Sequence, residues 1–239
     1  MARTPRRGTT RPTKAGHGTP RKATRHATPE PVEEPAADPV APAARTATVE
    51  RRTRETQIVL ALAIDGGGRA EIDTGIPFLD HMLELLARHG FFDLSVKASG
   101  DLDVDYHHTV EDVGLVLGQA LRQALGDRAG IRRFGEATVP LDEALVQSVV
   151  DLSGRPFLAY DVTLAHEKVG LFDLELIHDF LLALANSALM NVHVRMLAGR
   201  NPHHIVEAAF KGLARALDAA TSRDLRLEGP LSTKGTLTE

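Results

Sequence analysis

The sequence contains no cysteine, which excludes disulfide bonds, thiolate catalysis and zinc sites built from cysteines. Tryptophan is also absent and aromatic residues make up only 4%, so surfaces that stack nucleic-acid bases or sugars are not expected. No apolar stretch approaches the roughly 18 to 20 residues of a membrane-spanning helix. The net charge of -4 gives no reason to expect nucleic acid as a partner. These absences fit a cytoplasmic protein, and they leave the eleven histidines as the most informative residue type.

Residues 1–50 differ in composition from the rest of the chain. A basic stretch rich in Pro, Thr and Gly is followed by an acidic stretch rich in Pro and Ala. Neither has hydrophobic periodicity, so burial could not offset the entropy lost on ordering, and we predict a disordered extension. A transit peptide or a weak contact of the basic arm with nucleic acid or another partner are alternatives, although the prolines disfavour the helix of a mitochondrial presequence.

Residues 51–239 have the patterning of a globular domain. An alternating segment, TQIVLALAID, predicts a strand, and Pro77 opens an amphipathic helix that we expect to end at Gly90. A strand and a long helix beginning at His107 follow. The remaining elements are expected strands within 136–165, a helix over 173–189, a strand over 191–199 and a helix over 203–221.

The order helix, strand, HHxxE helix occurs twice, over residues 77–126 and 173–221. Such a repeat predicts an α+β fold of two similar halves related by a pseudo-twofold axis. We place the first half at about 51–130, the second at about 131–225, and a C-terminal tail at 226–239.

The repeated HHxxE motif indicates a metal site. On a helix, His108 and Glu111 share a face, as do His204 and Glu207, so each pair can offer a nitrogen and an oxygen to one cation. The adjacent histidine must point elsewhere, toward a second metal. This donor set fits Mn, Fe, Co, Ni or Zn. If the motif occurred once, the simpler interpretation would be that its histidines cap the start of a helix. Because the motif is duplicated, we favour a metal site.

His81 adds to the candidate site from the helix that precedes the first motif, next to Asp80. In the second half an offset of 98 residues places Asp179 opposite His81, so the order Asp-His has become His-Asp. Either Asp179 is a ligand, or a small helix rotation lets His178 reach the metal, or the site is weakened.

Several long motifs in order resemble imidazoleglycerol-phosphate dehydratase from about residue 51 to the C-terminus. They are GIPFLDHML (75–83), HHTVED (107–112), PLDEAL (140–145), DLSGRPFL (151–158), GRNPHHIVEAAFKGLARAL (199–217) and STKG (232–235). The resemblance implies two βα halves, each a small sheet with two helices on one face, with the helices packed between the two sheets. It also implies 24-subunit shells with active sites between subunits.

The implied activity is dehydration of imidazole glycerol phosphate to imidazole acetol phosphate in histidine biosynthesis, with two Mn(II) ions per active site. The family's metal-ligand positions fall on His81, His107, His108, Glu111, His203, His204 and Glu207. Its remaining ligand, a histidine, falls on Asp179. Its substrate contacts, some of them in the tail, fall on Glu55, His89, Arg133, Arg155, Lys211, Ser232 and Lys234.

The chemistry explains why such a site would need metal and carboxylate together. The carbon that loses water is not next to a carbonyl, so the substrate's imidazole must accept electrons, and a metal on its ring nitrogen favours an imidazolate intermediate. A carboxylate must move protons, and Glu55 and Glu207 are the candidates. The phosphate needs cations and donors, which Arg155, Lys211, Ser232 and Lys234 would supply.

The change at Asp179 motivates an alternative of another class. A relative of this family could keep the fold and assemble into a shell that binds metal without catalysing the reaction.

Overall fold

A computed structural model describes residues 44–237 of the chain. The predicted disordered extension falls mostly on residues 1–43, which lie outside the described part. Its predicted end at residue 50 is wrong, because strand β1 begins at Thr46 and runs to Arg52. This strand is an outer one whose side chains alternate between exposed and inward-facing with only Val49 fully buried, so it carries little hydrophobic signal.

The first half contains one four-stranded sheet and two helices. The sheet has the order β1-β2-β4-β3, with β2 at Thr56–Ala63, β3 at Ala70–Asp73 and β4 at Asp93–Gly100. The pairs β1–β2 and β2–β4 are antiparallel, and β3–β4 is parallel. Helix α1 spans Pro77–Gly90 and helix α2 spans His107–Leu125. Gly90 is the last helical residue as expected, but the left-handed residue that ends the helix is Phe91.

The second half repeats this arrangement. Its sheet has the order β5-β6-β10-β7, with β5 at Phe134–Leu141, β6 at Ala144–Asp151, β7 at Phe157–Asp161 and β10 at Asn191–Ala198. Helix α3 spans Leu176–Ala188 and helix α4 spans Pro202–Thr221. A short hairpin formed by β8 (Lys168–Val169) and β9 (Phe172–Asp173) was not predicted from the sequence.

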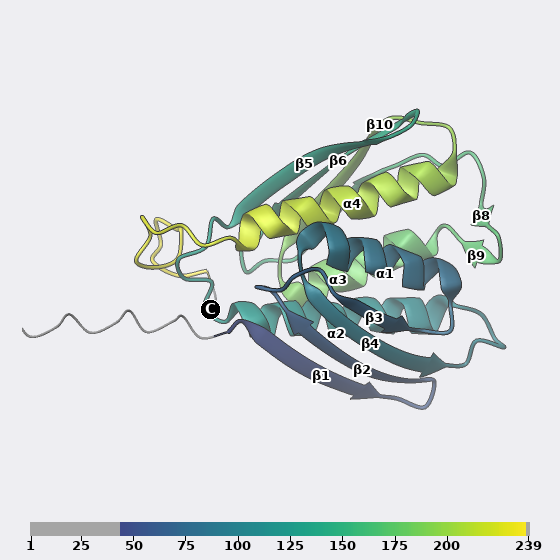
Figure 1. Cartoon of the computed structure of the whole chain (residues 1–239), viewed down its shortest axis with the longest axis horizontal. Coiled ribbons are helices and arrows are strands. Elements are labelled where there is room, and N and C mark those ends of the chain that lie inside the picture. The colour runs from purple at the N-terminus through teal and green to yellow at the C-terminus, as the bar shows by residue number, and fades with distance from the viewer. Residues whose placement is uncertain (1–43, 238–239) are drawn as a thin grey trace, which may run out of the picture. The chain divides into compact units, whose positions relative to one another are not determined.

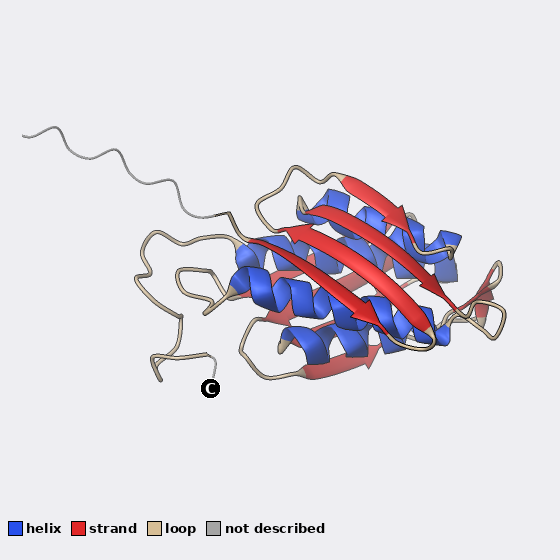
Figure 2. Cartoon of the chain, turned by 90° about the horizontal axis from the view of Figure 1, so that it is seen from below, coloured by secondary structure: helices blue, strands red, loops and turns tan. Residues whose placement is uncertain are grey.

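The four helices lie between the two sheets, as Figure 1 shows, so the predicted α+β fold of two similar halves is confirmed. Figure 2, seen from below, shows one sheet crossing in front of the helices. Each sheet alternates buried and exposed side chains because one face packs on helices and the other faces outward. Among the helices of residues 44–237, none has the length and apolarity needed to cross a membrane.

Helices pair across the two halves, α1 with α4 and α2 with α3. All four begin at the end of the molecule where the β8–β9 hairpin lies (Figure 1). The first turns of each pair therefore lie side by side, and both HHxxE motifs occupy first turns.

Two glycines on α2 allow the close approach of α3. A methyl group at Gly114 would lie 2.7 Å from the carbonyl oxygen of Phe180, and one at Gly118 would lie 2.7 Å from that of Leu184. Because both oxygens belong to the α3 backbone, the helices could accommodate these methyl groups only by moving apart. This contact sets the position of Asp179, the residue before Phe180, relative to α2.

We therefore predict that Gly118→Ala destabilises the protein by about 1–3 kcal/mol through overpacking, although alanine favours helix by about 1 kcal/mol in isolation. Denaturant-induced unfolding measures the change. Gln123→Ala, at an exposed position of the same helix, is the control and should change the free energy of unfolding by less than about 0.5 kcal/mol. A Gly118→Ala variant as stable as the parent would contradict the close-packing interpretation.

Candidate metal centre

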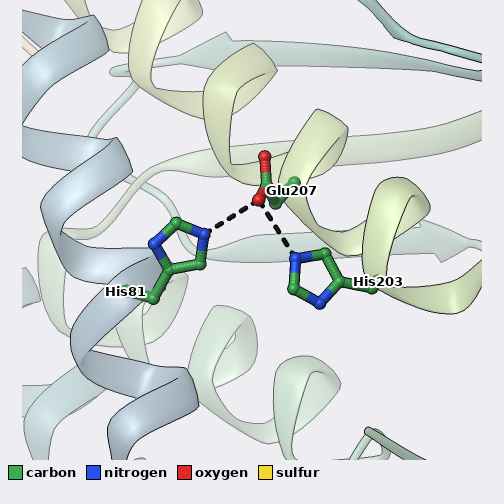
Figure 3. A group of neighbouring side chains, drawn as sticks. All are labelled: His81, His203 and Glu207. Carbon is green, nitrogen blue, oxygen red and sulfur yellow. Dashed lines mark hydrogen bonds and ion pairs between the residues drawn. The ribbon is translucent and has the colours of Figure 1, made fainter.

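One group of side chains brings three metal-binding atoms together at the α1–α4 contact. Nε2 of His81 lies 2.8 Å from Oε1 of Glu207, and Nε2 of His203 lies 3.1 Å from the same oxygen. Figure 3 shows both imidazoles pointing at this carboxylate, His81 from α1 and the other two residues from α4. Among the described residues, this is the one group with at least three such donors within 4.8 Å of one another. The donors come from both halves of the chain.

The local sequence explains how α4 presents its two donors. Pro202 occupies the first helical position, and the side chain of Asn201 accepts a hydrogen bond from the backbone N–H of His203 at 3.0 Å. The helix therefore starts at a defined residue, and positions four apart share a face. The expectation that His204 would pair with Glu207 is wrong, because the helix pairs Glu207 with His203.

Glu207 is engaged through both oxygens. Its Oε2 accepts a hydrogen bond from Nζ of Lys211 at 2.6 Å, while Oε1 faces the two imidazoles. Burial works to raise the pKa of Glu207, but hydrogen bonds from Lys211, His81 and His203 outweigh it and hold the pKa at about 2. The group is thus a carboxylate at neutral pH and a weak base.

The donor set fits a divalent first-row metal ion. Two imidazole nitrogens and a carboxylate oxygen, without thiolate, suit Mn, Fe, Co, Ni or Zn. Neighbouring ligands of an octahedral ion at about 2.1 Å lie about 3 Å apart, which matches the spacing of each imidazole nitrogen from Oε1 of Glu207. The two imidazoles are 41% and 40% exposed, so the group is open to further ligands on one side.

The α2–α3 contact carries a second, looser group. Nε2 of His107 lies 3.7 Å from Glu111, and its Nδ1 lies 3.3 Å from Oδ2 of Asp179. The helix again pairs residues four apart, so the expected pairing of His108 with Glu111 is also wrong. The two carboxylates approach opposite nitrogens of one ring, so they do not converge on a single point as the first group does.

Asp179, not His178, is the residue that faces the histidine pair. The ring of His178 instead contacts the ring of Tyr160, with centroids 5.7 Å apart, and its Nδ1 lies 3.2 Å from Asp179. Burial raises the pKa of Tyr160 to about 12, so the phenol is neutral at physiological pH. The helix rotation that would bring His178 into the site is not observed.

The remaining two motif histidines, His108 and His204, point away from these groups, whereas the sequence predicted that His107 and His203 would do so. Nδ1 of His108 lies 3.0 Å from Asp101 and 3.9 Å from Glu55. Nδ1 of His204 lies 2.9 Å from Glu143. The hydrogen bond to Asp101 raises the pKa of His108. Backbone N–H groups of Asn201 and Arg200, together with His204, lower the pKa of Glu143 to about 2.

The partners of these two histidines and the role of Asp80 were not predicted from the sequence. Asp101 lies in a loop that has no distinctive motif. Glu143 lies in the PLDEAL motif, and this glutamate in a turn was the one sequence feature that could have indicated a partner for His204. Oδ1 of Asp80 accepts hydrogen bonds from the backbone N–H and the hydroxyl of Thr74, at 2.9 and 2.5 Å. It fixes the start of α1.

A buried carboxylate, Asp112, supports the turn that carries Glu55. It accepts a hydrogen bond from the hydroxyl of Thr56 at 2.5 Å and pairs with Nε of Arg51 at 2.9 Å. Thr56 in turn contacts Thr53 across the β1–β2 turn. The last acidic residue of HHTVED is thus a structural contact between α2 and the first sheet.

The expected substrate-contact residues fall into separate places. Four of them line one cavity of about 1020 Å³ near the C-terminal end of α4: Arg133, Arg155, Ser232 and Lys234. The backbone N–H of Arg133 donates to the carbonyl of Ala220 in the last turn of α4. Since His203 is 17 residues earlier on this helix, roughly 25 Å separates the cavity from the metal donors.

The other expected contacts lie nearer the metal donors. Lys211 is bonded to Glu207, and Glu55 lies beside His108. His89 is half-buried near the C-terminal end of α1. Burial lowers the pKa of His89, and the positive charges of Lys211 and Arg215 lower it further. In one subunit, therefore, the expected residues do not form a single pocket.

Comparison with known proteins identifies the family. The imidazoleglycerol-phosphate dehydratase family model matches residues 74–217. The imidazoleglycerol-phosphate dehydratase of Geobacter sulfurreducens is 59% identical over 193 residues, covering 81% of this chain and 99% of the relative. The chain belongs to the imidazoleglycerol-phosphate dehydratase family.

Solved structures of the imidazoleglycerol-phosphate dehydratase family share the fold. The enzyme from Staphylococcus aureus superposes with a TM-score of 0.69 at 37% identity, covering 75% of this chain and 99% of that one. The enzyme from Pyrococcus furiosus, solved in complex with (S)-C348, gives a TM-score of 0.69 at 41% identity, covering 79% and 100%. A dehydratase removes water from its substrate, so these relatives are hydro-lyases.

The placement of residues 178 and 179 makes a testable distinction. We predict that Asp179→Ala weakens Mn(II) binding at least about tenfold, because it removes the carboxylate that contacts His107. His178→Ala is the matched control and should change the affinity less than twofold. Calorimetric titration of metal-free protein measures both, and the opposite pattern would assign the role to His178.

Proposed function

We propose that this chain dehydrates imidazole glycerol phosphate to imidazole acetol phosphate and water, a step of histidine biosynthesis that takes place in the cytoplasm. The observation that carries the proposal is the convergence of His81, His203 and Glu207 in a member of this family. The relatives named above support the reaction type and the substrate.

The proposal includes two Mn(II) ions per active site. Donors to them would be His81, His107, His108, Glu111, Asp179, His203, His204 and Glu207. Bound manganese would supply Lewis acidity that withdraws electrons from the substrate's imidazole and stabilises its imidazolate. The chain's own task would be to hold these donors in place, and the side-by-side first turns of the helices support this.

Glu55 is better placed than Glu207 to move protons at the glycerol carbon and the leaving hydroxyl. Glu207 has both oxygens engaged and a low pKa. The side chain of Glu55 is 55% exposed, and its nearest charged contact is His108 at 3.9 Å. A general acid or base must reach solvent or substrate, so Glu55 fits this role and Glu207 fits that of a ligand.

The C-terminal cavity suits the phosphate group. Arg155, Ser232 and Lys234 line it, and guanidinium, hydroxyl and ammonium groups are the usual phosphate partners. Arg133 is more firmly engaged: its guanidinium pairs with Asp151 and donates to the carbonyl of Leu231. It therefore fixes the described part of the C-terminal tail, residues 226–237, which presents Ser232. Lys211, bonded to Glu207, would meet the substrate nearer the metal.

A complete active site would form between subunits. Roughly 25 Å along α4 separates the phosphate-binding cavity from the metal donors, too far for one small substrate to contact both. The tail of one subunit would have to meet the metal donors of another. A homo-oligomer, by family resemblance a 24-subunit shell, would meet this requirement, and light scattering of the purified protein would measure its size.

A turnover assay with imidazole glycerol phosphate, combined with metal analysis, tests the proposal. We expect product formation, two manganese ions per chain and loss of activity when a chelator removes them. An assembled, metal-loaded protein without turnover would contradict the proposal. It would favour the alternative of a non-catalytic, metal-binding relative, which the looser group around Asp179 motivates.

We predict that Lys234→Ala raises KM for imidazole glycerol phosphate about tenfold or more, with a smaller change in kcat, because it removes a charge-assisted contact with the phosphate. Steady-state kinetics measures both constants. Lys97→Ala removes an exposed lysine from β4 and is the control. An unchanged KM would exclude Lys234 from the phosphate site.

A further inference from the structure

The two halves place a glutamate in corresponding turns. Glu55 lies in the turn between β1 and β2, and Glu143 lies in the turn between β5 and β6. These strands occupy the same two positions in their sheets. Each glutamate lies beside the second histidine of an HHxxE motif, Glu55 beside His108 and Glu143 beside His204.

Glu143 is fixed in place by contacts to both of its oxygens. Oε1 accepts hydrogen bonds from the backbone N–H groups of Asn201 and Arg200, at 2.7 and 3.1 Å. Oε2 lies 2.9 Å from Nδ1 of His204. Asn201 also caps α4, so one carboxylate joins the turn, the start of the helix and the histidine ring.

In the first half the same contact is made by a different residue. Nδ1 of His108 lies 3.0 Å from Oδ2 of Asp101, in the loop before α2, while Glu55 remains at 3.9 Å. Asp101 is only 26% exposed, whereas Glu55 is 55% exposed. The histidines thus have equivalent carboxylate partners, although those partners come from different elements.

A carboxylate that accepts a hydrogen bond from Nδ1 determines which ring nitrogen can bind a metal. An ionised carboxylate has no proton to donate, so Nδ1 must carry the hydrogen and Nε2 keeps its lone pair. Nε2 of His204 then faces away from Glu143, with Asp142 at 3.9 Å as its nearest charged contact. Histidine ligands in metal sites are commonly oriented in this way.

We propose that Glu143 and Asp101 are equivalent positioning residues that hold His204 and His108 in the tautomer whose Nε2 binds metal, which leaves Glu55 free for proton transfer. The inference rests on the proposed function, since it takes both histidines as ligands. The duplicated turn glutamates have therefore separated into two roles, one that orients a ligand and one that reaches the substrate.

The test compares Mn(II) binding to metal-free variants by calorimetric titration with manganese chloride. Glu143→Gln keeps the shape of the side chain and can still accept from the backbone N–H groups, but its amide donates to Nδ1 and so favours hydrogen on Nε2. We expect affinity about 10- to 100-fold weaker at the site of His204. Asp101→Asn should weaken the site of His108 similarly, while Glu55→Gln should lower kcat and leave the affinity within twofold.

Glu136→Gln, at an exposed position of β5, is the control for removing a carboxylate from the second sheet. Circular dichroism and light scattering check that each variant folds and assembles. If Glu143→Gln does not fold, Asp101→Asn tests the inference in the other half. Parent-like manganese affinity in a folded Glu143→Gln or Asp101→Asn variant would overturn the inference. Failure of the parent protein to bind manganese would instead contradict the proposed function.

Discussion

The parallel pairing of helices from opposite halves is the constraint on which the rest of the structure depends. Helix α1 meets α4 and α2 meets α3, with their first turns side by side. A helix pair in this orientation places a residue near the start of one helix beside the motif at the start of the other. His81 thus reaches His203 and Glu207, and neither half could build this group alone. The glycines at 114 and 118 keep the second pair equally close.

The two halves share the same backbone arrangement but differ in the side chains that contact the motif histidines. Both sheets have the same order and both motifs pair a histidine with the glutamate four residues later. The differences lie at the partner positions. Where α1 supplies His81, α3 supplies Asp179. Its carboxylate approaches Nδ1 of His107, whereas Glu111 approaches Nε2 of the same ring, so the donor atoms of this group do not converge on one point. Among the described residues, only the group of His81, His203 and Glu207 brings three metal-binding atoms within 4.8 Å of one another.

The candidate metal donors and the basic cavity lie at opposite ends of the helices. Metal donors occupy the N-terminal turns, and the arginine- and lysine-lined cavity lies beyond the last turn of α4. A rigid helix of 20 residues cannot bring its two ends together, so the distance is a fixed property of the fold. Association of subunits, as proposed for this family member, would then be required for the reaction itself and would couple stability of the assembly to activity.

The sequence by itself determined the element types, the internal repeat and the identity of most candidate donors, because these depend on hydrophobic periodicity and on motifs local in the chain. It predicted His204 as the partner of Glu207, whereas the structure pairs Glu207 with His203, because residues three and four apart both share a helix face. It also missed β1, whose few inward-facing side chains give a weak signal at an edge. Only the tertiary structure decided these points, the contact of Asp179 rather than His178 with His107, and the different contacts of Glu55 and Glu143. Each depends on contacts between segments remote in sequence, and such contacts are set by how helices pack and where turns meet them.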